Sequence, residues 1–283
     1  MKTNKNIQNF IGCDKEYEEA DIVLFGAPYD GTTSYRPGTR FAAKAMRMES
    51  SLGFETYSPY QDKDLTQISV FDHGDLVLPY GGPEQILDII SDFTRDVIKD
   101  NKIPIMIGGE HLVTLGTIRP IVEKYPGLHI IHFDAHTDLR HEFFDKELSH
   151  ATVMRRVWDL VGDGKIFQMG IRSGDKTEFE WAKEHLYQNK YNCNDIDYII
   201  EKTKGKPVYV TIDLDVLDPS VFPGTGTPEP GGIDFTTLLN CILKMSELNI
   251  VGADINELSP HYDPSGASTA VAIKTLRELL LVL

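Results

Sequence analysis

Short apolar runs recur along the chain and alternate with longer stretches of mixed polarity. The runs are rich in β-branched residues, which favour strands, and they cover residues 22–25, 68–71, 103–107, 128–133, 166–171, 208–212 and 250–253. Runs that are apolar at most positions are typical of strands buried on both faces. The alternation therefore predicts a parallel sheet wrapped by helices.

The clearest helical pattern follows Pro83. Apolar side chains recur at helical spacing from there to about Asp100, and proline suits the first turn of a helix. We expect a helix over this stretch, lying on a face of the sheet. The chain shows no internal repeat, low-complexity tract or flexible linker, so we expect residues 1–283 to form a single domain.

Composition narrows the classes of partner. The chain has 283 residues, 41% of them apolar, and its 28 Lys and Arg against 43 Asp and Glu give a formal net charge of −15. This acidic surplus, without a basic block, argues against nucleic acid and anionic membranes. The three cysteines, Cys13, Cys193 and Cys241, are far apart, and no apolar run approaches the roughly 18 residues that span a bilayer. We therefore expect a soluble protein of the cytoplasm.

Side chains that can bind metal ions follow three of the apolar runs within a few residues. In an open parallel sheet, ligands bind beyond the carboxyl ends of the strands. The candidates are His111 after the run 103–107, Asp134, His136 and Asp138 after the run 128–133, and Asp213 and Asp215 after the run 208–212. We expect these six residues to form one site.

Four carboxylates and two imidazoles form a donor set that suits hard or borderline divalent ions such as manganese. So many carboxylates in one place would repel one another without cations, which makes two metal ions the natural count. Two ions about 3.5–4 Å apart can share a bridging water and lower its pKa, so that a hydroxide is held for attack. Any one of the four Asp residues could instead cap a helix or form a turn. Such local roles do not explain why all six residues follow the ends of apolar runs. The set therefore predicts hydrolytic chemistry.

Three motifs resemble the signature motifs of the ureohydrolase family, which includes arginases and agmatinases. They are residues 108–112 (GGEHL), 134–138 (DAHTD) and 213–219 (DLDVLDP). Further segments, at 34–41, 170–173, 223–232 and 254–257, resemble agmatinases in particular. The resemblance implies a three-layer α/β/α fold with a mostly parallel sheet of about eight strands. It also implies two Mn²⁺ per subunit on the same six ligands, and a homo-oligomer such as a trimer or hexamer.

The resemblance also gives roles to residues outside the ligand set. Glu257 stands where the family uses a glutamate to grip the substrate guanidinium, a pairing that bidentate hydrogen bonds make strong. His150 stands where the family places a histidine that meets the substrate and relays protons. Ala151 follows it, where glycine is common in the family. Asp138, besides binding metal, is expected to pass a proton to the departing amine.

The implied reaction is hydrolysis of agmatine, a small cationic guanidino compound, to putrescine and urea. In the loop after Asp138, Glu142, Asp145 and Glu147 stand where arginases carry Asn and Ser donors, and acids suit a cationic amine tail. Arg140 in the same loop, with the histidine beside it, could instead bind an anionic tail, as in guanidinobutyrate or formiminoglutamate. Two further hypotheses are arginine as the substrate and a non-catalytic oligomeric scaffold of the same fold.

Three residues near the motifs stay outside the ligand set. His132 lies inside the run 128–133 and is expected to be a packed, hydrogen-bonded core residue. Asp218 is expected to shape its loop or to support a ligand, because a ligand there would need the chain to turn back. Asp254 could either support a ligand from behind or lie near the substrate tail.

Overall fold

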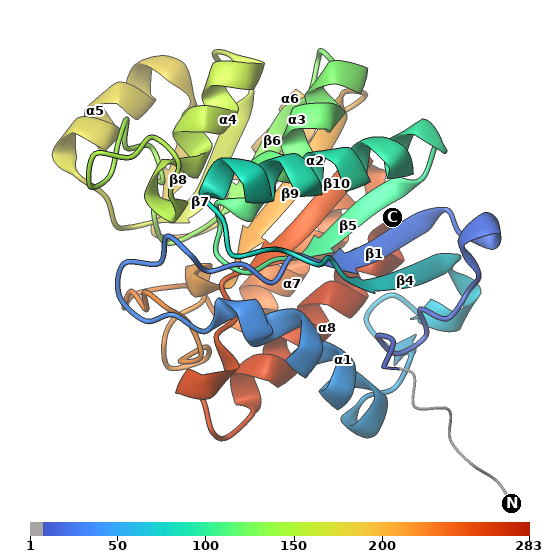
Figure 1. Ribbon diagram of the computed structural model, residues 1–283. Coiled ribbons are helices and arrows are strands. Elements are labelled where there is room, and N and C mark those ends of the chain that lie inside the picture. Colours follow the sequence, from blue (N-terminus) through green and yellow to red (C-terminus); the bar gives the residue numbers. More distant parts are fainter. Residues whose placement is uncertain (1–7) are drawn as a thin grey trace, which may run out of the picture.

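Eight strands form one central sheet in which every pairing is parallel. The computed structural model describes residues 8–283, and Figure 1 shows the sheet with its helices. From one edge to the other the strands are β4 (Val70–Asp75), β1 (Ile22–Gly26), β5 (Ile103–Ile107), β10 (Asn249–Asn256), β9 (Pro207–Asp213), β6 (His129–Phe133), β7 (Ile166–Ile171) and β8 (Tyr187–Lys190). A short antiparallel pair, β2 (Tyr57–Ser58) and β3 (Lys63–Asp64), lies outside this sheet.

Helices cover both faces of the sheet and so give three layers (Figure 1). One face carries α2 (Pro83–Lys99), α3 (Val113–Lys124), α4 (Val153–Val161) and α5 (Lys176–His185). The other carries α1 (Ala42–Gly53), α6 (Ile196–Thr203), α7 (Phe235–Lys244) and α8 (Ala267–Val282). Helix α3 packs against α2 and α4 in the first group, whereas α8 packs against α1 and α7 in the second. The predicted α/β class and its α/β/α layering are confirmed.

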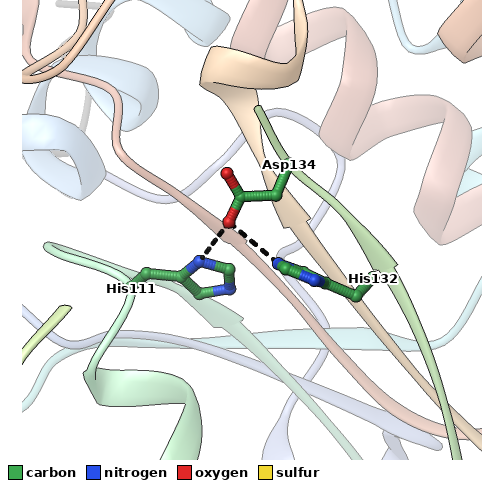
Figure 2. Close-up of side chains that lie close together, drawn as sticks. All are labelled: His111, His132 and Asp134. Atoms are coloured by element: carbon green, nitrogen blue, oxygen red, sulfur yellow. Dashed lines mark hydrogen bonds and ion pairs between the residues drawn. The ribbon is translucent and has the colours of Figure 1, made fainter. Parts of the chain in front are cut away.

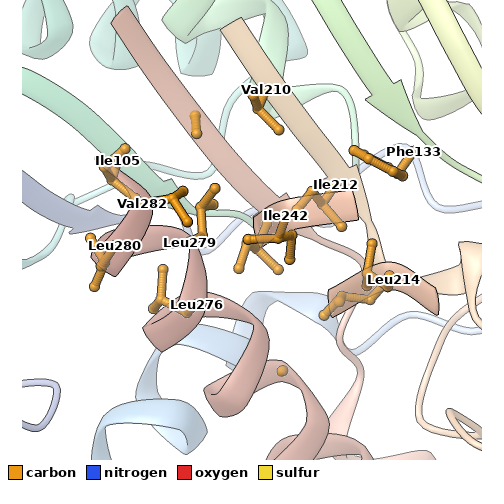
Figure 3. Close-up of a cluster of buried hydrophobic side chains, with 14 of the residues drawn as sticks. Ile105, Phe133, Val210, Ile212, Leu214, Ile242, Leu276, Leu279, Leu280 and Val282 are labelled. Carbon is orange, nitrogen blue, oxygen red and sulfur yellow. The ribbon is translucent and has the colours of Figure 1, made fainter. Parts of the chain in front are cut away.

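The larger core lies between the middle of the sheet and α8. Along β9 the side chains alternate, so that Val210 and Ile212 face this core and Tyr209 faces the core on the α3 side. Figure 3 shows Leu276 and Leu279 of α8 in the same cluster as Val210 and Ile212. Burying one such side chain stabilises the fold by about 1.5–3 kcal/mol. This core therefore anchors the central strands right up to the polar residues at their carboxyl ends.

All seven predicted strands occur, and the predicted helix after Pro83 is α2. The strand expected at 68–71 runs instead over β4, and the one expected at 250–253 extends over all of β10. The sequence does not predict β8, because this edge strand has the polar sequence Tyr-Gln-Asn-Lys and only one fully buried residue. Strand pairing, rather than an apolar run, defines it.

Three other expectations concern the chain as a whole. Within residues 8–283 no helix combines the length and the apolar character needed to cross a membrane. Cys13, Cys193 and Cys241, which are far apart in the sequence, are buried free thiols. The single domain over residues 1–283 stays a prediction, because residues 1–7 lie outside the described part of the chain.

Candidate metal centre

The six predicted ligands lie at the carboxyl edge of the central strands. Strands β5, β10, β9 and β6 are consecutive neighbours in the sheet. His111 follows β5, Asp134, His136 and Asp138 follow β6, and Asp213 and Asp215 lie at the end of β9 and just beyond it. Strand β10, which lies between β5 and β9, leads to Glu257. Segments distant in sequence therefore meet because their strands are adjacent.

One half of the cluster forms around His111. Its Nδ1 lies 3.1 Å from Oδ2 of Asp134, 3.2 Å from Oδ2 of Asp138 and 3.3 Å from Oδ2 of Asp213. All four side chains are buried. One imidazole nitrogen and three carboxylate oxygens thus converge from the ends of three strands.

The second half forms around His136 and shares Asp134 with the first. Nδ1 of His136 lies 3.4 Å from Oδ1 of Asp134 and 3.0 Å from Oδ2 of Asp215. The backbone holds Asp215 in place, because its Oδ1 accepts a 3.1 Å hydrogen bond from the Ala135 N–H and its own N–H donates to Asp213 Oδ1 at 2.9 Å. The two oxygens of Asp134 therefore face two different imidazoles, and the six predicted residues form one connected cluster.

The paired glycines of the 108–112 motif have a steric cause. A Cβ atom on Gly109 would lie 1.8 Å from the carbonyl oxygen of Tyr29, and one on Gly108 would lie 1.7 Å from Oδ1 of Asn256. The loop after β1 and the end of β10 thus pass directly against the segment that carries His111. Only glycine fits so close an approach of two backbones.

Behind the cluster a polar contact fixes the ring of His111. Thr211 pairs with Asp254 across β9 and β10, and its hydroxyl donates to Oδ1 of Asp254 at 2.6 Å. The hydroxyl oxygen of Thr211 lies 2.9 Å from Nε2 of His111, so it accepts from that nitrogen and Nδ1 faces the carboxylates. Asp254 is fully buried and, among the described residues, does not line the cavity of this site. Because Asp254 contacts Thr211, which in turn contacts His111, its position supports the role behind the six-residue cluster.

His132 contacts the cluster from the same side of the sheet. Figure 2 shows its ring and that of His111 approaching one oxygen of Asp134; Nε2 of His132 lies 2.9 Å from this Oδ2. On the far side of the ring, the amide of Gln168 donates to Nδ1 at 3.0 Å and also to the Thr137 carbonyl at 2.7 Å. Nδ1 therefore accepts, and Nε2 carries the proton toward Asp134. His132 is the packed, hydrogen-bonded residue expected, but its contact with Asp134 was not foreseen.

The pKa values and charged neighbours of the cluster indicate whether metal cations fit it. Burial, with a contribution from Asp134, raises the pKa of Asp138 to about 7, and burial with the charge of Asp215 raises the pKa of Asp213 well above its ordinary value. Burial would lower the pKa of His111, but the surrounding carboxylates outweigh it and raise the pKa well above 6.5. Among residues 8–283, no Lys or Arg forms an ion pair with the cluster. Crowded buried carboxylates without a Lys or Arg partner are the setting that divalent cations neutralise, so the donor set fits two such ions.

A cavity of about 300 Å³ opens onto the cluster and is lined by Glu257 and His150. Oε1 of Glu257 accepts a 2.8 Å hydrogen bond from the His111 N–H, and burial with the charge of Asp215 raises the pKa of Glu257 well above its ordinary value. Nε2 of His150 lies 3.2 Å from Oγ of Ser34, and its backbone N–H donates to Oγ1 of Thr32 at 3.0 Å. The contacts from Ser34 and Thr32 were missed, although the segment 34–41 was one of the motifs.

The outer part of the cavity differs from the expected one. Glu142, Asp145 and Glu147 do not line it, whereas Asp175 and Glu178 do. The expectation for those three loop acids was therefore wrong: the loop turns them away, and the acids come from the start of α5. Arg140 also lines the cavity, with its guanidinium 3.1 Å from Asp175, 3.6 Å from Glu178 and stacked on an aromatic ring, that of Phe143.

Comparison with known proteins agrees with this architecture. The profile of the arginase family matches residues 20–282. An agmatinase of Bacillus subtilis is 46% identical over 276 residues, covering 96% of this chain and 95% of that protein. Among solved structures, the agmatine ureohydrolase of Thermoplasma volcanium is 34% identical with a TM-score of 0.89 and covers 98% of this chain and 94% of its own. The proclavaminate amidino hydrolase of Streptomyces clavuligerus is 32% identical with a TM-score of 0.87, over 98% and 97% of the two chains. This chain therefore belongs to the arginase family of metal-dependent hydrolases.

Proposed function

We propose that this enzyme hydrolyses agmatine to putrescine and urea at a centre of two Mn²⁺ ions. The observation that carries the proposal is a single cavity lined by four residues of the cluster (His111, His136, Asp138 and Asp213), the Glu257 carboxylate and the acids at the start of α5. The similarity to the Bacillus subtilis agmatinase over almost the whole chain supports the same substrate. Water adds to the guanidinium carbon, the bond from that carbon to the alkyl-bearing nitrogen breaks, and the departing amine takes up a proton.

The ions would be held by His111, Asp134, His136, Asp138, Asp213 and Asp215. When bound, they would supply Lewis-acid activation of the attacking water. Manganese suits a set of mainly carboxylate oxygens with two imidazoles. The remaining steps belong to side chains of the cavity.

Glu257 orients the substrate in this proposal. Its Oε1 is fixed by the His111 N–H, so the carboxylate keeps one direction relative to the cluster and can accept hydrogen bonds from the guanidinium N–H groups. Fixing the guanidinium carbon beside the cluster turns attack into an intramolecular event. Asp138 carries a proton to the departing amine. His150, held by Ser34 and Thr32 near the cavity mouth, exchanges protons with solvent.

The outer part of the cavity supports a cationic tail. Asp175 and Glu178 contribute two negative charges and Arg140 one positive charge, which leaves one net negative charge. A protonated primary amine matches this charge, whereas the carboxylate of guanidinobutyrate or formiminoglutamate does not. Arg140 is already paired with Asp175, so an anionic tail would have to displace that contact.

The experiment is urea release from purified, Mn²⁺-loaded enzyme given agmatine, arginine and 4-guanidinobutyrate separately, and glutamate release from formiminoglutamate. Each reaction has a control with chelator. Urea from agmatine alone is the expected result. Turnover of an anionic-tail substrate instead would overturn the assignment of the tail and give Arg140 the recognition role. Turnover of none of the four would favour a non-catalytic scaffold.

Two further parts of the proposal concern the protein as a whole. We propose a homo-oligomer, a trimer or a hexamer, and a location in the cytoplasm. Light scattering during size-exclusion chromatography gives the mass of the assembly, to be compared with multiples of 31.8 kDa. A monomer at micromolar concentration would contradict the first part.

A further inference from the structure

Asp138 has an unusual backbone conformation for its residue type. Its φ angle is +51°, in the left-handed region that residues with a Cβ seldom adopt. Its carboxylate nevertheless has to reach His111 Nδ1 at 3.2 Å. Such a conformation persists only where surrounding contacts impose it.

One set of contacts comes from α4. The Asp138 carbonyl oxygen accepts hydrogen bonds from the N–H groups of Met154 at 3.0 Å and Arg155 at 3.2 Å. These groups belong to the first turn of the helix, where N–H groups lack partners within the helix. This contact holds the peptide unit that follows Asp138, and the Gln168 amide, which donates to the Thr137 carbonyl at 2.7 Å, holds the one before it.

The other set comes from one buried carboxylate, that of Glu178 in α5. Oε1 of Glu178 accepts from the Thr137 hydroxyl at 2.5 Å and from the Leu139 N–H at 3.0 Å. Thr137 and Leu139 flank Asp138 directly, so a single oxygen grips the chain on both sides of it. Oε2 accepts from the Asp175 N–H at 2.7 Å, which fixes the Glu178 side chain to the start of its own helix. Glu178 is only 5% exposed, so water does not compete for these bonds.

We propose that Glu178 is a positioning residue that sets the orientation of the Asp138 carboxylate for metal binding. It does so through Thr137 and Leu139, which its Oε1 holds, and this role is additional to the charge that Glu178 contributes to the outer cavity. The inference rests on the proposed metal centre but not on the identity of the substrate. It differs from a role in attracting the cationic tail, which would depend on the charge of Glu178 and not on its hydrogen bonds to the 137–139 segment.

Two substitutions separate these roles. Glu178→Gln keeps a carbonyl oxygen for Thr137 and Leu139 but loses the charge and the bond to the Asp175 N–H. Glu178→Ala removes all three hydrogen bonds. Ala182→Gly, in the same helix and outside the hydrogen bonds of Glu178, is the control for a general loss of α5 stability.

The measurement is calorimetric titration of metal-free protein with MnCl₂. We expect Glu178→Ala to weaken the binding of at least one Mn²⁺ by about tenfold to a hundredfold, while Glu178→Gln stays within about threefold of the wild type. Ala182→Gly should bind both ions as the wild type does. At saturating Mn²⁺, Glu178→Ala should lower kcat for agmatine well below the kcat of Glu178→Gln, whereas the lost charge should affect KM equally in the two variants.

Wild-type Mn²⁺ affinity and kcat in a folded Glu178→Ala variant would overturn the proposal. A raised KM in both Glu178 variants with unchanged metal affinity would instead assign Glu178 to the substrate tail. If the wild type binds two Mn²⁺ but hydrolyses no guanidino compound, the proposed function fails while the metal titration still decides the role of Glu178.

Discussion

The backbone N–H of His111 donates a 2.8 Å hydrogen bond to the carboxylate of Glu257. In return, the Glu257 N–H donates to the carbonyl of Gly109 at 3.0 Å. The loops after β5 and β10 are thereby joined in both directions, and the φ angle of Glu257, +67°, is held in the left-handed region. A residue proposed to grip the substrate is thus fixed to a residue proposed to bind metal, which leads to the first prediction.

Glu257→Gln should separate substrate binding from metal binding. The glutamine carbonyl can still accept from the His111 N–H, so the loop keeps its shape, but the charged pairing with the guanidinium is lost. Because a hydrogen bond to a charged group is worth about 1.5–3 kcal/mol, we expect kcat/KM for agmatine to fall about a hundredfold. Steady-state urea release and elemental analysis of bound manganese are the measurements. Unchanged kcat/KM would refute the role, and loss of manganese would show that the loop had moved.

Metal removal should destabilise the enzyme, and substitution of Thr211 should change how strongly stability depends on Mn²⁺. A ligand present at a thousand times its Kd raises the free energy of unfolding by about 4 kcal/mol, so chelation should lower Tm and added Mn²⁺ should restore it. Thr211→Val removes the oxygen that holds His111 Nε2 and should weaken Mn²⁺ binding roughly tenfold to a hundredfold. Thermal unfolding across a MnCl₂ series measures both. Identical Mn²⁺ dependence in variant and wild type would contradict the prediction.

The stability of the metal-free protein should fall as pH drops from about 6.5 to about 4, in part because of His150. Burial, aided by the charge of His136, lowers the pKa of His150 from 6.5 to about 4. Between these values the unfolded chain binds a proton at this ring and the folded chain does not, so acid favours unfolding. Urea denaturation at pH 7 and pH 5 measures the loss of stability. In His150→Gln that loss should be smaller, and an equal loss would contradict the assignment.

Gly109→Ala should destabilise the fold, because its new methyl group would meet the carbonyl oxygen of Tyr29. Overpacking of this kind costs about 1–3 kcal/mol, and the shift would reach His111 two residues later. Gly127→Ala is the matched control, since a Cβ there meets no atom within 4 Å. Chemical denaturation of both variants gives the free energy of unfolding. Equal free energies of unfolding in the two variants would contradict the prediction. They would show that the segment around Tyr29 shifts to make room for the methyl group at little cost.

The sequence predicts the strands well, and it predicts that the six proposed ligands lie together, because both depend on local signals. Each buried strand is an apolar run, and the polar residues of the cluster stand at or just after the ends of such runs. Strand β10 shows the limit: the run ends at Ala253, but Asp254 and Asn256 still pair within the sheet. They can be buried because Tyr209, Thr211 and Asn256 donate hydrogen bonds to the Asp254 carboxylate.

The sequence does not predict individual side-chain contacts between segments that are distant in sequence. Thr32 meets His150 from 118 positions away, and Glu178 meets Thr137 from 41 positions away. No spacing rule pairs such residues, since they meet only through the order of the strands. The same holds for the outer cavity, where the acids come from α5 and not from the loop that follows the 134–138 motif.

The place of β10 has a consequence for how the chain is assembled during synthesis. β10 is the last strand of the sheet to be made, yet it lies between β5 and β9 in the middle. Until it emerges from the ribosome, two partial sheets, β4-β1-β5 and β9-β6-β7-β8, each expose a long apolar edge to other chains. Pairing between strands so distant in sequence also slows folding. The entropy cost of closing the long loop comes before the new contacts can stabilise the chain. The six proposed metal ligands come together only when this last strand joins β5 to β9, so we expect the nascent chain to bind Mn²⁺ only after β10 has paired.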